Sequence, residues 1–189
     1  MSTAAKTVTL SEVTWSKFTA LCCPDLKYTQ TFTWNGHSFD AGPRQDVLHA
    51  CAGAGSSLLT QRSRIDGAAG TSSMVLTFRN RLAQACTLTG YPGVDALAKS
   101  GVVLAHAKRT LRGNAGGASG VSTVRLAPGA AASATLEWHN FGANGSSCAM
   151  SASIVATPAN TQDSTTLPVS VSVCGLQIHP TVAGSSGRS

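Results

Sequence analysis

Short segments in which apolar and polar residues alternate recur along most of this chain, from residue 56 onward. Met74, Leu76 and Phe78, for example, alternate with mostly polar neighbours before the run ends at Asn80. A period of two residues puts alternate side chains on opposite faces of a β-strand. Clusters of Gly, Pro, Asn and Ser separate the segments, as turns do. The expected strands are Ser57–Arg64, Ser73–Arg79, Val102–His106, Val121–Leu126, Ala132–Trp138, Ala149–Ala156, Val169–Val173 and Leu176–His179.

Composition and periodicity both argue against helices. Charged residues make up 12% of the 189 residues, whereas exposed helix faces are usually filled with Glu, Lys and Arg. Hydrophobic residues make up 42%, which is too much for a disordered chain. No capped segment with a sustained 3.6-residue period follows residue 50. We therefore expect an all-β fold, an antiparallel and immunoglobulin-like β-sandwich with an atypical N-terminal extension.

Charge divides the chain into unequal parts. Residues 1–50 carry four basic and four acidic residues, so the net charge of +6 lies entirely in residues 51–189. Six of the ten aromatic residues precede residue 50. This predicts an N-terminal extension of uncertain status (1–50), a β-sandwich domain (51–180) and a flexible tail (181–189).

The start of the chain lacks the usual export signals. No stretch approaches the roughly 20 apolar residues of a transmembrane helix, and residues 1–18 have no apolar run of the secretory kind. Leu48-His49-Ala50-Cys51 has the outline of a bacterial lipoprotein cleavage site, but the preceding segment is too polar for one. We interpret the match as chance. The alternative is that residues 1–50 come from a misassigned start.

Six cysteines bear on the cellular compartment. No C-x-x-C occurs, so the spacing matches no zinc module. Three disulfide pairings are possible among the four cysteines after residue 50, which are Cys51, Cys86, Cys148 and Cys174. Chain order favours the bonds Cys51–Cys86 and Cys148–Cys174, which need an oxidising compartment. The alternative is four free thiols in a cytosolic protein. The adjacent Cys22 and Cys23 cannot easily bridge each other, and we assign them no function.

The segment Cys86–Val94, CTLTGYPGV, resembles an actinobacterial domain-of-unknown-function family, number 4232, of secreted proteins and lipoproteins. The glycine, strand and asparagine from Gly70 to Asn80 are similar to the family's pattern, as are Leu126–Gly129 (LAPG) and the strand that ends at Trp138. The resemblance covers about residues 51–180 and implies an extracytoplasmic β-sandwich with two disulfides. It implies no activity. Residues 1–50 depart from the family, whose members usually begin with a signal.

The same motif has a physical interpretation in the four residues Gly90, Tyr91, Pro92 and Gly93. Pro92 would fix φ at the second position of a type II turn, and Gly93 would take a positive φ at the third. Tyr91 would cover the neighbouring disulfide with its ring. We therefore expect a structural role for this turn.

Catalytic and metal-binding patterns are weak. No G-x-S-x-G, P-loop, dinucleotide fingerprint or H-E-x-x-H is present. Glu137 and His139 would share one face of a strand and Asp95 follows a turn, which is the best set for an unrecognised hydrolase. An ion pair on the strand face is the simpler interpretation. A copper site would need Cys148, Met150 and His139 with His106 or His179, and we expect neither metal nor cofactor.

The basic surplus suggests a partner without defining it. Eight Lys and Arg residues lie along strands and beside a glycine-rich loop at residues 113–120, without the aromatic residues or basic helix typical of nucleic-acid binders: Arg62, Arg64, Arg79, Arg81, Lys108, Arg109, Arg112 and Arg125. We expect no nucleic acid and no transmembrane segment, and an anionic cell-envelope component as a candidate partner. The hypothesis is a non-catalytic, extracellular or envelope-associated binding or scaffolding protein of the cell wall; the alternative is an extracytoplasmic hydrolase.

Overall fold

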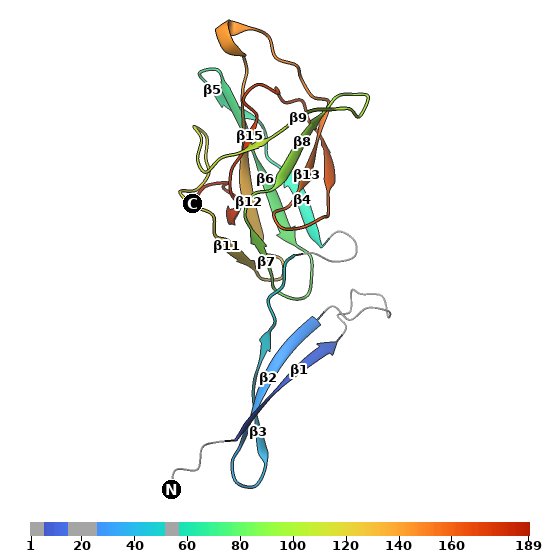
Figure 1. The fold of residues 1–189 in the computed structure, drawn as a ribbon, viewed down its shortest axis with the longest axis vertical. Coiled ribbons are helices and arrows are strands. Elements are labelled where there is room, and N and C mark those ends of the chain that lie inside the picture. The colour runs from blue at the N-terminus through green and yellow to red at the C-terminus, as the bar shows by residue number, and fades with distance from the viewer. Residues whose placement is uncertain (1–5, 15–25, 52–56) are drawn as a thin grey trace.

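The computed structural model describes residues 6–14, 26–51 and 57–189. Within these ranges the regular structure is almost entirely β-strand, and the one helical segment is the 3₁₀ turn η1 (Ala143–Gly145). The all-β prediction is therefore confirmed. Figure 1 shows a large body of strands that holds the C-terminal part of the chain and a small separate sheet formed by the N-terminal part.

The N-terminal extension forms a three-stranded antiparallel sheet, which the sequence did not predict. Its order along the sheet is β1 (Thr7–Thr14), β2 (Leu26–Trp34) and β3 (Phe39–Asp46). The side chain of Gln84 joins this sheet to the large body, because its amide accepts from the Lys27 backbone N–H at 3.0 Å and donates to the Lys27 carbonyl. Cys22 and Cys23 lie outside the described residues.

The large body contains two main sheets and a two-stranded one. The seven-stranded sheet has the order β10-β15-β12-β6-β4, with β16 paired to β12 and β5 to β6, and all its pairs are antiparallel except β10–β15. The four-stranded sheet has the order β14-β13-β8-β9, and β11 pairs with β7. The bounds are β4 (Leu58–Arg62), β5 (Asp66–Ala68), β6 (Thr71–Asn80), β7 (Cys86–Thr89), β8 (Gly93–Leu97), β9 (Val103–His106), β10 (Lys108–Arg109), β11 (Thr123–Leu126), β12 (Ala131–His139), β13 (Ser153–Thr157), β14 (Thr165–Pro168), β15 (Gln177–Ile178) and β16 (Val182–Ala183).

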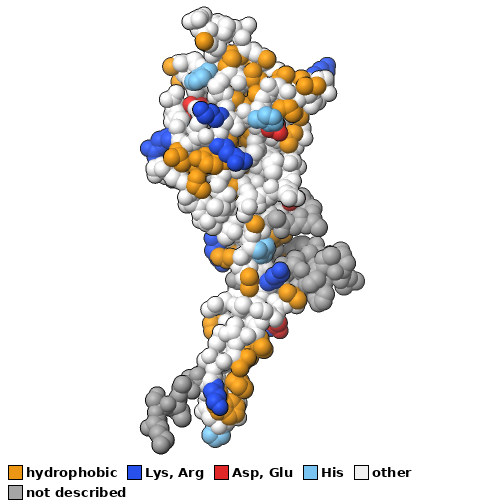
Figure 2. All heavy atoms as spheres, viewed as in Figure 1, with side chains coloured by type: hydrophobic (Ala, Val, Ile, Leu, Met, Phe, Trp, Pro, Cys, Tyr) orange, Lys and Arg blue, Asp and Glu red, His pale blue; other side chains and the backbone are white. Residues whose placement is uncertain are grey.

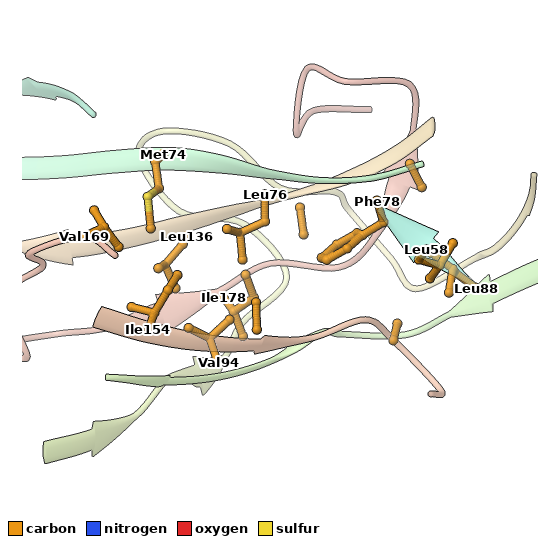
Figure 3. Close-up of a cluster of buried hydrophobic side chains, with 14 of the residues drawn as sticks. Leu58, Met74, Leu76, Phe78, Leu88, Val94, Leu136, Ile154, Val169 and Ile178 are labelled. Carbon is orange, nitrogen blue, oxygen red and sulfur yellow. The ribbon is translucent and has the colours of Figure 1, made fainter. Parts of the chain in front are cut away.

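The hydrophobic core lies between the two main sheets. Figure 3 shows Met74 and Leu136, from β6 and β12, pointing toward Ile154 on β13. All three side chains are at most 2% exposed. Two sheets that face each other across one apolar layer are consistent with the expected sandwich. The immunoglobulin-like topology stays a prediction.

Two expected elements differ in the structure. Val169–Val173 is not a ladder strand: Ser172 forms an isolated bridge with Met150, and the paired strand is β14, which ends at Pro168. The alternation of Val and Ser there reflects the burial of Val169 and Val171, which needs no ladder. The strand expected at Ala149–Ala156 begins only at Ser153.

Residues 181–189, for which the sequence predicts a flexible tail, include the short strand β16 and make contacts with β12. β16 pairs with β12, and the Gly187 N–H donates to the buried Ser133 Oγ at 2.9 Å. The Gly187 carbonyl in turn accepts from the buried Thr135 Oγ1 at 2.9 Å. These contacts satisfy polar groups in the middle of β12, which would otherwise be buried without partners.

Candidate functional site

Two disulfides hold the large body together, with the pairing that chain order favours. Cys51–Cys86 ties the segment before β4 to the start of β7, and both cysteines are completely buried. Cys148–Cys174 links the segment after η1 to the one before β15. A cysteine that carries lipid on its sulfur cannot also form a disulfide, so the bonded Cys51 argues against the lipoprotein interpretation. Each bond closes a loop worth about 3–4 kcal/mol of chain entropy.

The Gly90–Gly93 motif does not form the expected type II turn. Gly93 begins β8, and Gly90 is the residue with a positive φ, of 100°. Pro92 is buried, and the Gly90 carbonyl accepts from the Thr181 N–H at 2.9 Å. Gly93 pairs with Thr157 in the β8–β13 ladder, and this ladder requires an extended backbone rather than a turn conformation. The motif therefore positions the chain between β7 and β8.

The structure separates the three residues that suggested a hydrolase. Asp95 on β8 pairs with His106 at 2.6 Å, on the surface of the four-stranded sheet. His139 is exposed at the end of β12, where its Nδ1 lies 3.4 Å from Thr71 Oγ1. Glu137 is completely buried and has a different histidine partner, His179. The predicted strand-face ion pair between Glu137 and His139 is therefore wrong, because the histidine beside the Glu137 carboxylate is His179, at 3.5 Å.

A glycine-rich loop covers the Glu137 carboxylate. Oε2 accepts from the Ala115 N–H at 2.7 Å, and Oε1 accepts from the Asn114 N–H at 3.1 Å and from Gln177 Nε2 at 3.1 Å. Burial by itself would raise the pKa of Glu137, but the two backbone amides and the neighbouring His179 lower it below its ordinary value. The carboxylate is therefore a charged anchor for the loop.

The loop can approach this closely because glycine occupies the contact positions. A Cβ on Gly113 would lie 2.7 Å from His179 Nε2 and closer still to Glu137 Oε2. Gly117 has a φ of +101°, and a Cβ there would lie 2.5 Å from the Leu111 carbonyl oxygen. The glycines are thus required by packing, and the sequence alone showed only that they were frequent.

His179 completes the buried pair. Its Nδ1 lies 3.1 Å from both the carbonyl oxygen and the Oγ1 hydroxyl of Thr110. Its Nε2 lies 3.5 Å from Glu137 Oε2 and has no hydrogen-bond partner. The ring is completely buried. The pair thus sits beneath the loop, where it supports the surface above.

The C-terminal segment fastens the other side of the same loop. The Gly117 N–H donates to the Gly187 carbonyl at 3.1 Å, and Arg188 Nε donates to the Ala115 carbonyl at 2.9 Å. Ala115 therefore donates its N–H to Glu137 and accepts from Arg188. Arg188 was missed by the sequence because it was assigned to a tail.

Arg188 lines three hollows that adjoin one another, which we call the Arg188 groove. The largest, of about 580 Å³, runs between residues 118–125 and the C-terminal segment; the second, of about 250 Å³, lies over the loop; the third, of about 260 Å³, reaches β5. Their polar lining includes Arg112, Asn114, Ser119, Ser122, Thr123, Arg125, Arg188 and Ser189. Figure 2 shows Lys and Arg side chains close to apolar ones on one side of the large body.

The charge of the groove is mainly positive. Arg112, Arg125 and Arg188 line it, and Asp66, at the β5 end, is the one carboxylate side chain among the described lining residues. Two of these arginines belonged to the expected basic surplus, and the fold brings them to one surface with Arg188. The side chains of the groove can offer charged donors and hydroxyl groups to an anionic chain.

Two further findings concern metal ligands and membrane-spanning helices in the described part of the chain. They contain no group of three or more His, Cys, Asp or Glu side chains placed to hold a metal ion, and Cys148 is bonded to Cys174, so its sulfur is no thiolate for copper. No helix within the described ranges is long and apolar enough to cross a membrane.

The fold and the site define a disulfide-bonded, all-β domain with an N-terminal sheet attached. Residues 51–184 match the family described as domain of unknown function DUF4232. The chain belongs to that family. Neither the curated proteins nor the solved structures contain a match to this chain.

Proposed function

We propose that this protein is a non-catalytic, secreted or envelope-associated module that binds an anionic polymer of the cell wall in the Arg188 groove. The observation that carries the proposal is the groove itself, in which three arginines from distant parts of the chain meet beside hydroxyl side chains. An open surface of three adjoining hollows, lined by three arginines, suits a repeating anionic chain better than a small neutral substrate.

A binding role is supported by the state of Glu137. A general acid or base must reach the reacting atom within hydrogen-bond distance. Glu137 has no exposed surface, and its oxygens already accept three hydrogen bonds from Asn114, Ala115 and Gln177. These contacts suit a structural anchor, and they leave the hydrolase alternative without its best acid or base.

An extracytoplasmic location is supported by the two disulfides, because such bonds persist in oxidising compartments. The test is intact mass, with and without reduction and thiol alkylation, of protein recovered from the culture fluid and the envelope of the native cell. Two disulfides in that material support export. A chain with free thiols, found only in the cytoplasm, would overturn it.

The binding proposal is tested with a poly(glycerol phosphate) chain as the probe and neutral dextran as its control. Arg112→Gln should weaken binding about fivefold, which corresponds to the loss of one partly screened contact of about 1 kcal/mol. Arg81→Gln is the matched control, because it removes the same charge from an exposed residue that does not line the groove. Equal weakening by both variants would mean that net charge, and not the groove, attracts the polymer.

The hydrolase alternative is tested on the same protein with a panel of ester, glycoside and peptide substrates. The proposal expects no turnover that depends on Glu137. Turnover that Glu137→Gln abolishes, while the variant keeps its fold by circular dichroism, would replace the binding function with an enzymatic one.

A further inference from the structure

The N-terminal sheet presents an apolar face that no described part of the chain covers. Alternation along β1 and β2 places Val8, Leu10, Phe32 and Trp34 on one face, and the β2–β3 register adds Phe39 beside Trp34. The Trp34 and Phe39 rings lie 5.2 Å apart. Leu10 is 53% exposed and Phe39 51%, although large apolar side chains in a sheet normally pack on a second layer. We call this surface the apolar face.

The opposite face of the same sheet has a different character. It carries Thr7, Thr9, Thr29, Thr31 and Thr33, and the hydroxyls of Thr9 and Thr31 lie 3.0 Å apart. The sheet is therefore amphipathic, with one face suited to water and one suited to a partner. Three isolated strands gain little stability until their apolar face is buried.

We propose that the apolar face packs against the apolar face of a second copy of this chain, so that two N-terminal sheets form a two-layered dimer. A two-fold interface of this kind needs a self-complementary surface. Among the described side chains of this face, the two charged ones are Glu12 and Arg44, and they pair with each other at 3.1 Å. Arg44 also lies 5.8 Å from the centre of the Tyr28 ring.

The distribution of charge favours this contact. Residues 1–50 carry no net charge, whereas residues 51–189 carry the whole +6. Two copies that meet through their N-terminal sheets bring neutral surfaces together. Any contact through the large bodies would instead bring two positive surfaces together, which costs free energy.

The edges of the sheet favour a protein partner over a lipid bilayer. In the order β1-β2-β3, the outer edges of β1 and β3 carry backbone groups that have no strand partner among the described residues. Such edges do not enter hydrocarbon, because their polar groups would lose their hydrogen bonds to water. Face-to-face packing of two sheets leaves these edges in water.

The size of the face sets the expected strength. Three strands about 4.8 Å apart and about eight residues long, at about 3.3 Å per residue, cover roughly 15 by 26 Å. Because side chains make each face uneven, two such faces that pack together would remove roughly 1,000–1,200 Å² of accessible surface from water, which is near the lower limit for specific interfaces. The dimer should therefore form at micromolar concentrations.

Sedimentation velocity of the full chain, with free thiols alkylated without reduction, tests the proposal. The mass should rise from 19.2 kDa toward twice that value between about 1 and 300 μM. Leu10→Lys and Ala41→Lys, on the two edge strands of the apolar face, should each hold the chain at 19.2 kDa. Ser11→Lys, which puts the same charge at the next residue on the opposite face, should dimerise like the natural chain.

Three results would overturn the proposal. One is a natural chain that stays monomeric over the whole range. Another is dimerisation that survives both Leu10→Lys and Ala41→Lys while circular dichroism shows their folds unchanged. The third is a monomeric chain that sediments with phosphatidylcholine or phosphatidylglycerol vesicles and loses them on Leu10→Lys, because a lipid surface would then be the partner.

Discussion

Replacing Gly113 with alanine should destabilise the protein by about 3 kcal/mol. The added Cβ would lie 2.7 Å from His179 Nε2 and 2.8 Å from His179 Cε1, and closer still to Glu137 Oε2. Neither side chain can withdraw, because both are completely buried. The backbone at Gly113 lies outside the left-handed region, so the effect comes from lack of space alone. The loop must therefore lift away from β12.

The magnitude follows from the contacts that lifting breaks. The N–H groups of Asn114 and Ala115 donate to the Glu137 carboxylate at 3.1 and 2.7 Å. A hydrogen bond to a charged group contributes about 1.5–3 kcal/mol. Water that enters beneath the lifted loop replaces part of this hydrogen bonding, so we take the lower value for each of the two bonds. The expected loss in the free energy of unfolding is therefore about 3 kcal/mol.

Urea unfolding at neutral pH, followed by circular dichroism, measures this loss. With a slope of about 2 kcal/mol per molar urea, the midpoint should fall by about 1.5 M. Gly120→Ala is the matched control, because a Cβ at that position of the same loop meets nothing within 4 Å, and its midpoint should stay within about 0.3 M of the natural protein. A Gly113→Ala midpoint equal to that of Gly120→Ala would refute the close packing of loop and carboxylate.

Three further predictions follow from single contacts. Because the pKa of Glu137 is lowered in the folded state, its ionised form stabilises the fold at pH values above the ordinary pKa of about 4.5, and this stability is lost as the pH falls through the lowered pKa. Urea midpoints measured from pH 7 to pH 3 should therefore fall steeply for the natural chain and less for Glu137→Gln. Parallel curves for the two proteins would contradict the lowered pKa of Glu137. Gly90→Ala should lower the free energy of unfolding by about 1 kcal/mol, because the φ of Gly90 is +100°. Gly93→Ala should lower it by less than about 0.5 kcal/mol, because the nearest atom to an added Cβ would lie at 3.6 Å. Equal losses of stability for both variants in thermal melts would support the type II turn expected from the sequence. Replacing Cys148 and Cys174 together by serine should lower the free energy of unfolding by about 3 kcal/mol in urea, and an unchanged midpoint would show that the bond adds nothing.

Strands were predictable where one face is buried and the other is not. In β6 the burial of Met74, Leu76 and Phe78 matches the alternation of the sequence, so periodicity identified the strand. β8 was missed because Gly93 follows Pro92, a pair that usually indicates a turn. The structure instead places the positive φ at Gly90, three residues earlier. The conformation of residues 92–93 is therefore set by the pairing of β8 with β13 and not by the local turn preference of Pro-Gly.

The Arg188 groove was not predictable from the sequence because its parts are far apart in the chain. Arg112 lies just before the glycine-rich loop, Arg125 on β11 and Arg188 near the C-terminus. Long-range pairing of β12 with β15 and β16 brings their segments to one surface. The clearest available signal was the density of glycine at residues 113–120. It indicated a special loop, but not that a buried carboxylate lies beneath it.

The buried Glu137 connects the stability of the fold to the shape of the groove. A charge at the centre of a sheet is costly, and an apolar residue on β12 would pack there at lower free energy. An apolar residue, however, would leave the Asn114 and Ala115 N–H groups without acceptors, and the loop would lose its anchor. Since Ala115 also accepts from Arg188, an unanchored loop would release the arginine that all three hollows share. Glu137→Leu should therefore abolish polymer binding at temperatures where the sheets remain folded, which poly(glycerol phosphate) titration and circular dichroism on the same sample would show.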